Sequence, residues 1–273
     1  MPVENSNTKL HYDELNFSDN AKAAIIFLHG FTGSLNDWEK IPSKFKENYN
    51  IYAIDLIGHG KSDSPNEADQ YSTSSQINQL AETISLITKD KIILAGYSMG
   101  GRLALSFSSI HPEFLKGLIL ESTTAGIADK KLREAREKSD EELADFILNN
   151  PIEKFVDYWM NLDIFSTQKN LPKEILIKLK HDKLRNNKTG LANSLLGFST
   201  GIMPPLFNKI KNINIKTLLI TGELDIKYIN INNEMVKIFP DALHRIIQNA
   251  GHNVHMENPD EFYNVINDYL KEL

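Results

Sequence analysis

The chain has no cysteine and no long run of apolar residues. Without cysteine it can form no disulfide, no thiolate metal site and no cysteine nucleophile. Its longest continuous apolar stretch, residues 23–28, is far too short to cross a bilayer. Residues 1–17 lack the apolar segment of a signal peptide. We therefore expect a cytoplasmic protein that does not insert into a membrane.

Arginine is also scarce. Only five of the 30 basic residues are arginine, and the rest are lysine. The arginines are Arg102, Arg133, Arg136, Arg185 and Arg245. In a chain that otherwise prefers lysine, an arginine is expected where a planar fork of N–H donors is needed. The net charge of -6 argues against nucleic acid as a partner, but it allows a locally positive pocket.

Six short runs of nearly continuous apolar residues are typical of parallel strands that are covered on both faces. They span residues 23–30, 51–60, 91–98, 117–122, 216–225 and 243–252. Helical patterns alternate with these runs, which predicts a mostly parallel α/β sheet flanked by helices. Residues 9–17 are candidates for antiparallel edge strands. With 273 residues, 41% of them hydrophobic, the chain is long enough for such a core.

Residues 123–207 interrupt this alternation, because they contain no convincing strand. They are predicted to form helices over residues 129–150, 151–162, 172–187 and 190–201. We expect this insertion to form a helical cap over the carboxyl edge of the sheet, where the ligands of open α/β sheets bind. Residues 1–122 and 208–273 then form the core.

The sequence G-Y-S-M-G at residues 96–100 lies between a predicted strand and a predicted amphipathic helix. In this context the pattern G-x-S-x-G predicts a nucleophile elbow, a sharp turn that exposes Ser98 at the edge of the sheet. Gly96 and Gly100 leave room where the strand and the helix nearly collide. The N-terminus of the helix adds positive potential and free N–H groups beside the serine.

A serine hydroxyl becomes an effective base or nucleophile when a histidine takes its proton. His252 follows the last predicted strand and Asp225 follows the fifth, so both should reach the sheet edge that carries Ser98. The alternatives are His255 as the base and Glu121 or Glu223 as the acid. We favour His252, directly after a strand-ending glycine, and Asp225, because a short carboxylate suits the orientation of an imidazole.

The segment L-H-G-F-T-G-S after the first predicted strand is expected to supply half of an oxyanion hole. In this interpretation the backbone N–H of Phe31 pairs with the N–H of Met99, the residue after the serine. We expect His29 to brace this loop. We expect His59 and Asp63, in the segment G-H-G-K-S-D, to fix a turn.

Together these motifs resemble the α/β-hydrolase superfamily. More particularly, the chain resembles the 2-succinyl-6-hydroxy-2,4-cyclohexadiene-1-carboxylate synthase family of menaquinone biosynthesis. The segments that carry this resemblance are GYSMGGR (96–102), LILES (118–122), the W-x5-F spacing from 159 to 165 and LRNNKTG (184–190). The resemblance covers nearly the whole chain, and it implies an α/β-hydrolase fold with an inserted cap.

The resemblance also implies a reaction and a set of pocket residues. Members of that family eliminate pyruvate from a cyclohexene that carries an enolpyruvyl ether and three carboxylates, without a cofactor or a metal. A small tricarboxylate substrate, no cofactor and no metal are therefore implied here. The implied substrate-binding residues are Tyr97, Arg102, Arg136, Trp159 and Arg185. Arg133 is the alternative to Arg136 if the match is shifted by one helical turn.

On this hypothesis Ser98 acts as a base and not as an acyl-forming nucleophile. It removes a ring proton with the help of His252 and Asp225, and the oxyanion hole stabilises the enolate-like oxygen before pyruvate leaves. Two other functions remain open. The first is a carboxylesterase or C–C bond hydrolase that uses the same triad through an acyl-enzyme. The second is a non-catalytic binding protein on the same fold.

Overall fold

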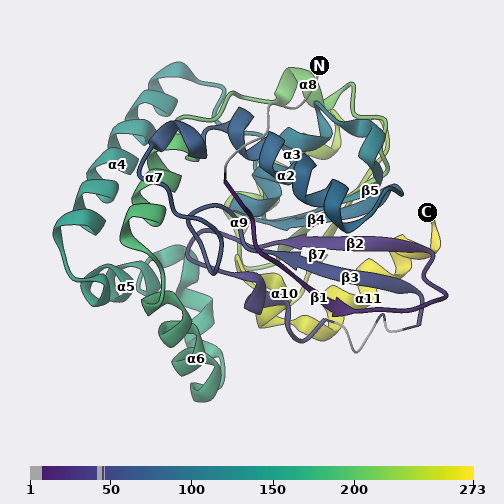
Figure 1. The fold of residues 1–273 in the computed structure, drawn as a ribbon, viewed down its shortest axis with the longest axis horizontal. Helices are drawn as coiled ribbons and strands as arrows, with labels where there is room; N and C mark the ends of the chain where they lie inside the picture. The colour runs from purple at the N-terminus through teal and green to yellow at the C-terminus, as the bar shows by residue number, and fades with distance from the viewer. Residues whose placement is uncertain (1–7, 42–44, 46) are drawn as a thin grey trace.

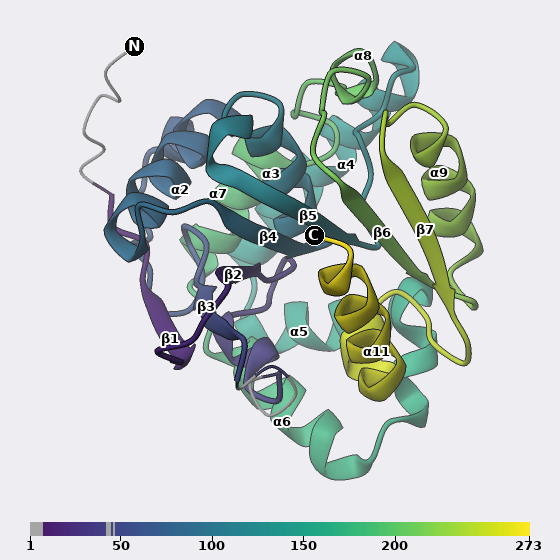
Figure 2. The same ribbon diagram turned by 90° about the vertical axis from the view of Figure 1, so that its right-hand side faces the viewer.

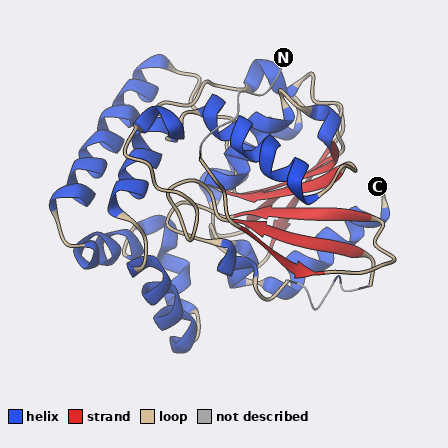
Figure 3. Ribbon diagram, in the orientation of Figure 1, coloured by secondary structure: helices blue, strands red, loops and turns tan. Residues whose placement is uncertain are grey.

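The computed structural model describes residues 8–41, 45 and 47–273. Within them, seven strands form one sheet in the order β1-β3-β2-β4-β5-β6-β7 (Figures 1 and 3). Their bounds are Tyr12–Asn16, Ala23–Leu28, Tyr49–Ile54, Ile92–Tyr97, Leu115–Glu121, Thr217–Gly222 and Ala242–Ile247 for β1 to β7. β1 pairs antiparallel with β3, and all other neighbours are parallel. The predicted parallel sheet is confirmed, and residues 9–17 contain one edge strand.

Helices cover both faces of the sheet, because successive strand residues point to opposite sides and both sides are apolar. Ile26 and Leu94 face the layer that contains α2, α3 and α9. Phe27 and Ile93 face the layer that contains α11, on the opposite side (Figure 2). The bounds of these helices are Thr73–Ile87, Met99–Ser108, Ile226–Val236 and Pro259–Lys271.

Several strands end earlier than the sequence predicts. The run expected at 51–60 ends as a strand at Ile54. Immediately afterwards, the Asp55 carboxylate accepts the backbone N–H of Lys61 at 2.9 Å, which closes a turn. It also accepts the N–H of Leu35, in the loop after β2, at 2.7 Å. Gly58 and Gly60 adopt φ angles of +78° and +54°, which favour glycine. The apolar residues after Ile54 therefore belong to a loop at the sheet edge.

Between β5 and β6 the chain forms helices at the four predicted positions. They are α4 (Lys130–Asn149), α5 (Ile152–Met160), α6 (Lys173–Leu184) and α7 (Lys188–Phe198). Figure 1 shows them gathered beyond one end of the sheet. The ring of Phe31, in the loop after β2, lies 5.1 Å from the ring of Trp159, so α5 contacts the loop at the carboxyl end of β2.

The short helices α8 and α10 span Phe207–Ile210 and Val254–Glu257. In the described ranges, no helix is both long and apolar enough to cross a bilayer. The expectation about a signal peptide concerns residues 1–17, of which residues 1–7 lie outside the described part.

Candidate active site

Ser98 occupies a strained turn between β4 and α3. Its φ and ψ angles are 50° and −102°, in a region that residues with a side chain rarely adopt. A Cβ atom added to Gly96 would lie 2.5 Å from the carbonyl oxygen of Gly100. One added to Gly100 would lie 2.5 Å from the carbonyl oxygen of Leu28. The two glycines therefore permit the close approach that the sequence pattern predicts, and the turn carries Ser98 to the edge of the sheet.

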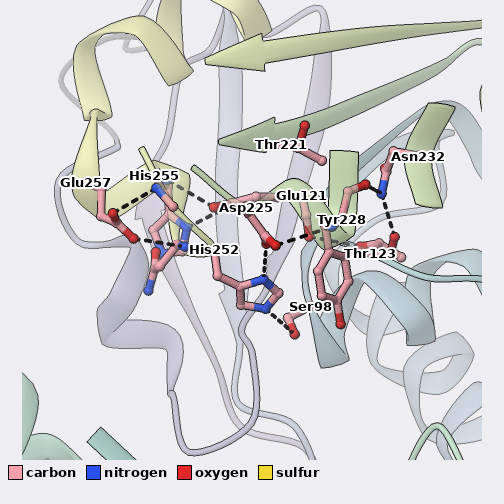
Figure 4. Close-up of polar contacts among 12 residues, drawn as sticks. Ser98, Glu121, Thr123, Thr221, Asp225, Tyr228, Asn232, His252, His255 and Glu257 are labelled. Atoms are coloured by element: carbon pink, nitrogen blue, oxygen red, sulfur yellow. Dashed lines mark hydrogen bonds and ion pairs between the residues drawn. The ribbon is translucent and has the colours of Figure 1, made fainter. Parts of the chain in front are cut away.

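Ser98, His252 and Asp225 lie in a row (Figure 4). The Nε2 atom of His252 is 3.2 Å from the Oγ of Ser98, and its Nδ1 is 2.7 Å from the Oδ2 of Asp225. The side chains of His252 and Asp225 are only 3% and 6% exposed. Because the ionised carboxylate only accepts hydrogen bonds, it fixes the proton on Nδ1 and leaves Nε2 free to take a proton from the serine.

The alternative base and acid form a separate buried pair. The Nδ1 of His255 is 2.7 Å from the Oε2 of Glu121, and both side chains are almost fully buried. The side chain of Glu223 lies elsewhere and accepts the backbone N–H of Asn249 at 3.1 Å. Only His252 is hydrogen-bonded to the hydroxyl of Ser98 among the described residues, so the geometry favours the first choice made from the sequence.

The loop that carries His252 is held from both sides by one carboxylate. Glu257 accepts the backbone N–H of Gly251 at 2.8 Å and that of Asn253 at 3.2 Å (Figure 4). Because these two N–H groups flank His252 in the chain, the loop is fixed where the imidazole leaves it. This carboxylate was not singled out by the sequence motifs.

The predicted oxyanion loop follows β2. As expected, His29 braces it: the Nδ1 of His29 is 2.8 Å from the carbonyl oxygen of Gly30, and its Nε2 accepts the N–H of Leu56 at 2.9 Å. In the part of the chain that the structure describes, neither the N–H of Phe31 nor that of Met99 is hydrogen-bonded to a backbone acceptor. Their joint use as an oxyanion hole remains a prediction.

The nearby turn at residues 58–63 also has the bracing role that we expected. His59 is 1% exposed, and its Nδ1 is 3.0 Å from the carbonyl oxygen of Ile57. The carboxylate of Asp63 accepts the backbone N–H of Lys9 at 2.7 Å. Both side chains therefore fasten the backbone at this edge of the sheet.

Two aromatic residues from the resemblance lie beside this machinery. The ring of Tyr97 lies 5.5 Å from the ring of His252 and 5.1 Å from that of His255. Burial raises the pKa of the Tyr97 phenol well above its usual value. The indole ring of Trp159 lies 5.1 Å from that of Phe31, and its buried N–H has no partner among the described residues. That N–H remains a donor for a bound molecule.

Arg102 connects the elbow helix to the inserted helices. Its Nη1 donates to the carbonyl oxygen of Phe198 on α7 at 2.5 Å, and its guanidinium lies 4.8 Å from the centre of the Phe198 ring. Burial lowers the pKa of Arg102 to about 10, so the group stays charged at neutral pH. A partly buried cation therefore lies one helical turn beyond Ser98.

Of the two neighbouring arginines on α4, Arg136 pairs with a buried carboxylate, although its own side chain is 41% exposed. Its Nε donates to the Oδ2 of Asp140 at 2.7 Å, and the Asp140 side chain is only 4% exposed. The positive charge of Arg136 lowers the pKa of Arg102 and the negative charge of Asp140 raises it. Arg133 instead donates to the carbonyl oxygen of Ile127, before the helix. The geometry favours Arg136 over Arg133 as a pocket residue.

Arg185 occupies a different place from the other predicted arginines. It lies at the end of α6, it is exposed, and it lines a cavity that is also bounded by Thr32, Asp37 and Asp182. Ser98 is not among the residues that line this cavity. The role of Arg185 in carboxylate binding therefore rests on the resemblance and remains a prediction.

Lys183, two residues before Arg185, was missed by the sequence analysis. Its Nζ donates to the Oγ1 of Thr32 at 2.9 Å, and it also lines a second cavity that includes Phe31 and Tyr97. Burial lowers the pKa of Lys183, although nearby carboxylates act in the opposite direction. A lysine on a charged amphipathic helix gives no sequence signal for this position, because most such lysines face solvent.

Tyr228 was also missed. Its ring lies 4.5 Å from the imidazole of His252, and burial raises the pKa of its phenol. A signal was present in the sequence, because Tyr228 lies three residues after Asp225, which is one helical turn. Using it required the knowledge that α9 starts directly after Asp225.

In residues 8–41, 45 and 47–273, no cluster of three or more histidine and carboxylate side chains could hold a metal ion.

Comparisons with known proteins agree with this geometry. A model of the α/β-hydrolase fold family matches residues 23–259, so the chain belongs to that family. A relative from Bacillus subtilis (strain 168) is 43% identical over 256 residues, which are 93% of this chain and 92% of the relative. Its name gives 2-succinyl-6-hydroxy-2,4-cyclohexadiene-1-carboxylate synthase as a provisional activity. At this identity and coverage, the chain belongs to the family of these synthases.

Two further proteins support the same placement. A relative from Enterobacter sp. (strain 638), named as the same synthase, is 32% identical over 236 residues, which are 86% of each chain. A solved structure described as MenH from S. aureus has a TM-score of 0.91 and 31% sequence identity. It covers 97% of this chain and 98% of its own. The similarity therefore extends over the sheet and the inserted helices alike.

Proposed function

We propose that this protein is a cofactor-independent lyase. It eliminates pyruvate from 2-succinyl-5-enolpyruvyl-6-hydroxy-3-cyclohexene-1-carboxylate and forms 2-succinyl-6-hydroxy-2,4-cyclohexadiene-1-carboxylate, a step of menaquinone biosynthesis. The names of the two relatives support this reaction. The single structural observation that carries it is the partly buried guanidinium of Arg102, one helical turn from Ser98, because the substrate is a tricarboxylate.

The reaction begins with a proton transfer. The Oγ of Ser98 removes a ring proton while the Nε2 of His252, 3.2 Å away, takes the proton of the serine. The buried carboxylate of Asp225 stabilises the imidazolium that forms. No covalent bond between Ser98 and the substrate is required, since the serine serves only to pass a proton.

The electron pair left on the ring carbon is delocalised onto the oxygen of the succinyl ketone. In this mechanism the N–H groups of Phe31 and Met99 donate to that oxygen, where preorganised donors contribute most. The electrons then return to the ring and break the C–O bond of the enolpyruvyl ether. The second ring double bond forms, and the leaving enolate takes a proton to become pyruvate.

The substrate is proposed to bind between the sheet edge and the inserted helices. We propose that residues 123–207 act as a cap on a core formed by residues 1–122 and 208–273. Arg102 and Arg136 would bind carboxylates from the side of α3 and α4, and Arg185 would do so from the end of α6. The protein would act in the cytoplasm on this small molecule, with neither a cofactor nor a metal.

The decisive experiment is to supply the enolpyruvyl substrate and to measure pyruvate with lactate dehydrogenase. The wild-type protein and Ser74→Ala, which alters an exposed serine, should release pyruvate, whereas Ser98→Ala should not. No release, together with rapid hydrolysis of short p-nitrophenyl esters, would establish a hydrolase instead. Unchanged behaviour of Ser98→Ala in both assays would favour a binding protein.

A further inference from the structure

Tyr228 is held rigidly beside the triad. Its backbone N–H donates to the Oδ1 of Asp225 at 3.3 Å, and its carbonyl oxygen accepts the Nδ2 of Asn232 at 2.9 Å. The same Nδ2 donates to the carbonyl oxygen of Thr123, just after β5, and Asn232 is fully buried (Figure 4). The first turn of α9 is thus tied both to the acid of the triad and to the neighbouring strand end.

The side chain of Tyr228 lies against the base of the triad but shares no hydrogen bond with it. The two rings are 4.5 Å apart and tilted by 58°, so the phenol packs on the imidazole of His252 (Figure 4). The phenolic hydroxyl of Tyr228 has no hydrogen-bond partner in the described part of the chain. Because burial raises the pKa of the phenol, it is neutral at physiological pH and can donate its proton in a hydrogen bond.

Two guanidinium groups act electrostatically on this phenol. The positive charges of Arg102 and Arg136 both lower the pKa of Tyr228, against the effect of burial, so both are within electrostatic reach of the phenol. The Nη1 of Arg102 donates to the carbonyl oxygen of Phe198 and to the Sδ of Met203. The Nε of Arg136 donates to Asp140. Each guanidinium has five N–H donors, so others are left for a ligand. The Tyr228 ring packs on the imidazole, and the charges of two arginines, from α3 and α4, act on its phenol.

We propose that the hydroxyl of Tyr228 donates a hydrogen bond to a substrate carboxylate that is held by Arg102 and Arg136. This inference rests on the proposed function, because it assigns a third donor to the recognition of the tricarboxylate. An ionised carboxylate has about four lone-pair sites, so it can accept a hydrogen bond from a neutral hydroxyl in addition to those from guanidinium groups. Tyr228 is then a specificity-determining residue in addition to the arginines.

The test compares Tyr228→Phe with the wild-type protein and with Tyr158→Phe, whose side chain is exposed on α5. Removing only the hydroxyl keeps the ring on His252, so the packing is preserved. Because Tyr228→Phe loses a hydrogen bond to a charged group, its KM for the enolpyruvyl substrate should be about tenfold or more above the wild-type KM. Its kcat should stay within about twofold of the wild-type kcat. Tyr158→Phe should match the wild type. An unchanged KM in Tyr228→Phe would overturn the proposal.

A second readout separates substrate binding from an effect on the imidazole. Phenylmethanesulfonyl fluoride is neutral and labels an activated serine, so its rate with Tyr228→Phe should equal the wild-type rate. A slower rate, or a fall in kcat without a change in KM, would mean that the hydroxyl acts through His252 and would overturn the proposal. Equal midpoints of thermal unfolding for the wild type and Tyr228→Phe show that both proteins are folded when they are compared.

Binding to inactive protein keeps this test separate from that of the reaction. The dissociation constant of the same substrate is measured by calorimetry with Ser98→Ala and with Ser98→Ala combined with Tyr228→Phe. A dissociation constant about tenfold larger in the double variant supports the proposal. This holds even if the wild-type protein releases no pyruvate, because that result would refute only the lyase reaction. Equal constants, or no binding to either form, would refute the role of Tyr228.

Discussion

The turn beneath the predicted oxyanion loop should make the protein sensitive to acid through His59. Its imidazole is 1% exposed, and its Nε2 has no hydrogen-bond partner among the described residues. Burial lowers the pKa of His59 to about 3, with smaller contributions in the same direction from His29 and Lys183. The folded protein therefore keeps this histidine neutral, whereas the unfolded chain protonates it near pH 6.5.

The sign and size of the effect follow from these two values. Above pH 6.5 both states hold a neutral imidazole, and stability is unaffected. As the pH falls below 6.5, the unfolded chain binds a proton that the folded state refuses until about pH 3, so stability is progressively lost. Between pH 8 and pH 5 this single group should reduce the free energy of unfolding by about 2 kcal/mol.

Urea denaturation at pH 8 and pH 5 measures this loss. His59→Asn removes the titrating group and retains an amide that can donate to the carbonyl oxygen of Ile57, which the imidazole now contacts. The variant should lose about 2 kcal/mol less than the wild type between the two pH values. His181→Asn, at a position whose side chain is 69% exposed, should lose as much as the wild type. If His59→Asn shows the wild-type loss, the reasoning about His59 is wrong.

Three further predictions concern the site. Asp225→Asn should reduce the rate of pyruvate release by roughly 10⁴-fold, whereas Glu223→Gln should leave it within about twofold, and equal losses would reject the triad assignment. Gly100→Ala should destabilise the protein by more than about 2 kcal/mol in urea unfolding, because its Cβ would lie 2.5 Å from a carbonyl oxygen; a smaller loss would show that the elbow can relax. Arg136→Ala should raise KM by at least about tenfold and Arg133→Ala by less than about twofold, as steady-state kinetics will measure; the reverse order would mean that the pocket arginine is Arg133.

The order of elements in the fold could be predicted because each strand carries its own signal. Short, continuous apolar runs between amphipathic segments indicate buried parallel strands, whatever the rest of the chain does. The ends of the strands were less predictable. Apolar residues after Ile54 continue the strand pattern, but the carboxylate of Asp55 accepts the backbone N–H of Lys61, six residues later, and the chain turns away. That bend depends on residues on both sides of the turn, which periodicity does not weigh.

The orientation of α4 shows where the sequence allowed a partial prediction. Asp140, Ala144 and Ile147 are buried on one face of this helix, and the spacing of four residues puts Arg136 on the same face. The apolar positions were visible in the sequence. However, that this face meets α7, and therefore lies near Arg102, became clear only when the helices were packed together.

The sequence by itself determined that Ser98, a histidine and a carboxylate meet at one edge of a sheet. Parallel strands bring their carboxyl ends to the same edge, so residues that follow three such strands are close in space. Only the tertiary structure decided which members pair: His252 reaches Ser98, while His255, one turn further on, turns to Glu121. The physical reason is that the direction of a side chain is set by packing between segments far apart in the chain. The same reason places Lys183 beside Thr32 and Tyr228 beside His252, both partly buried, although no local motif marks the lysine.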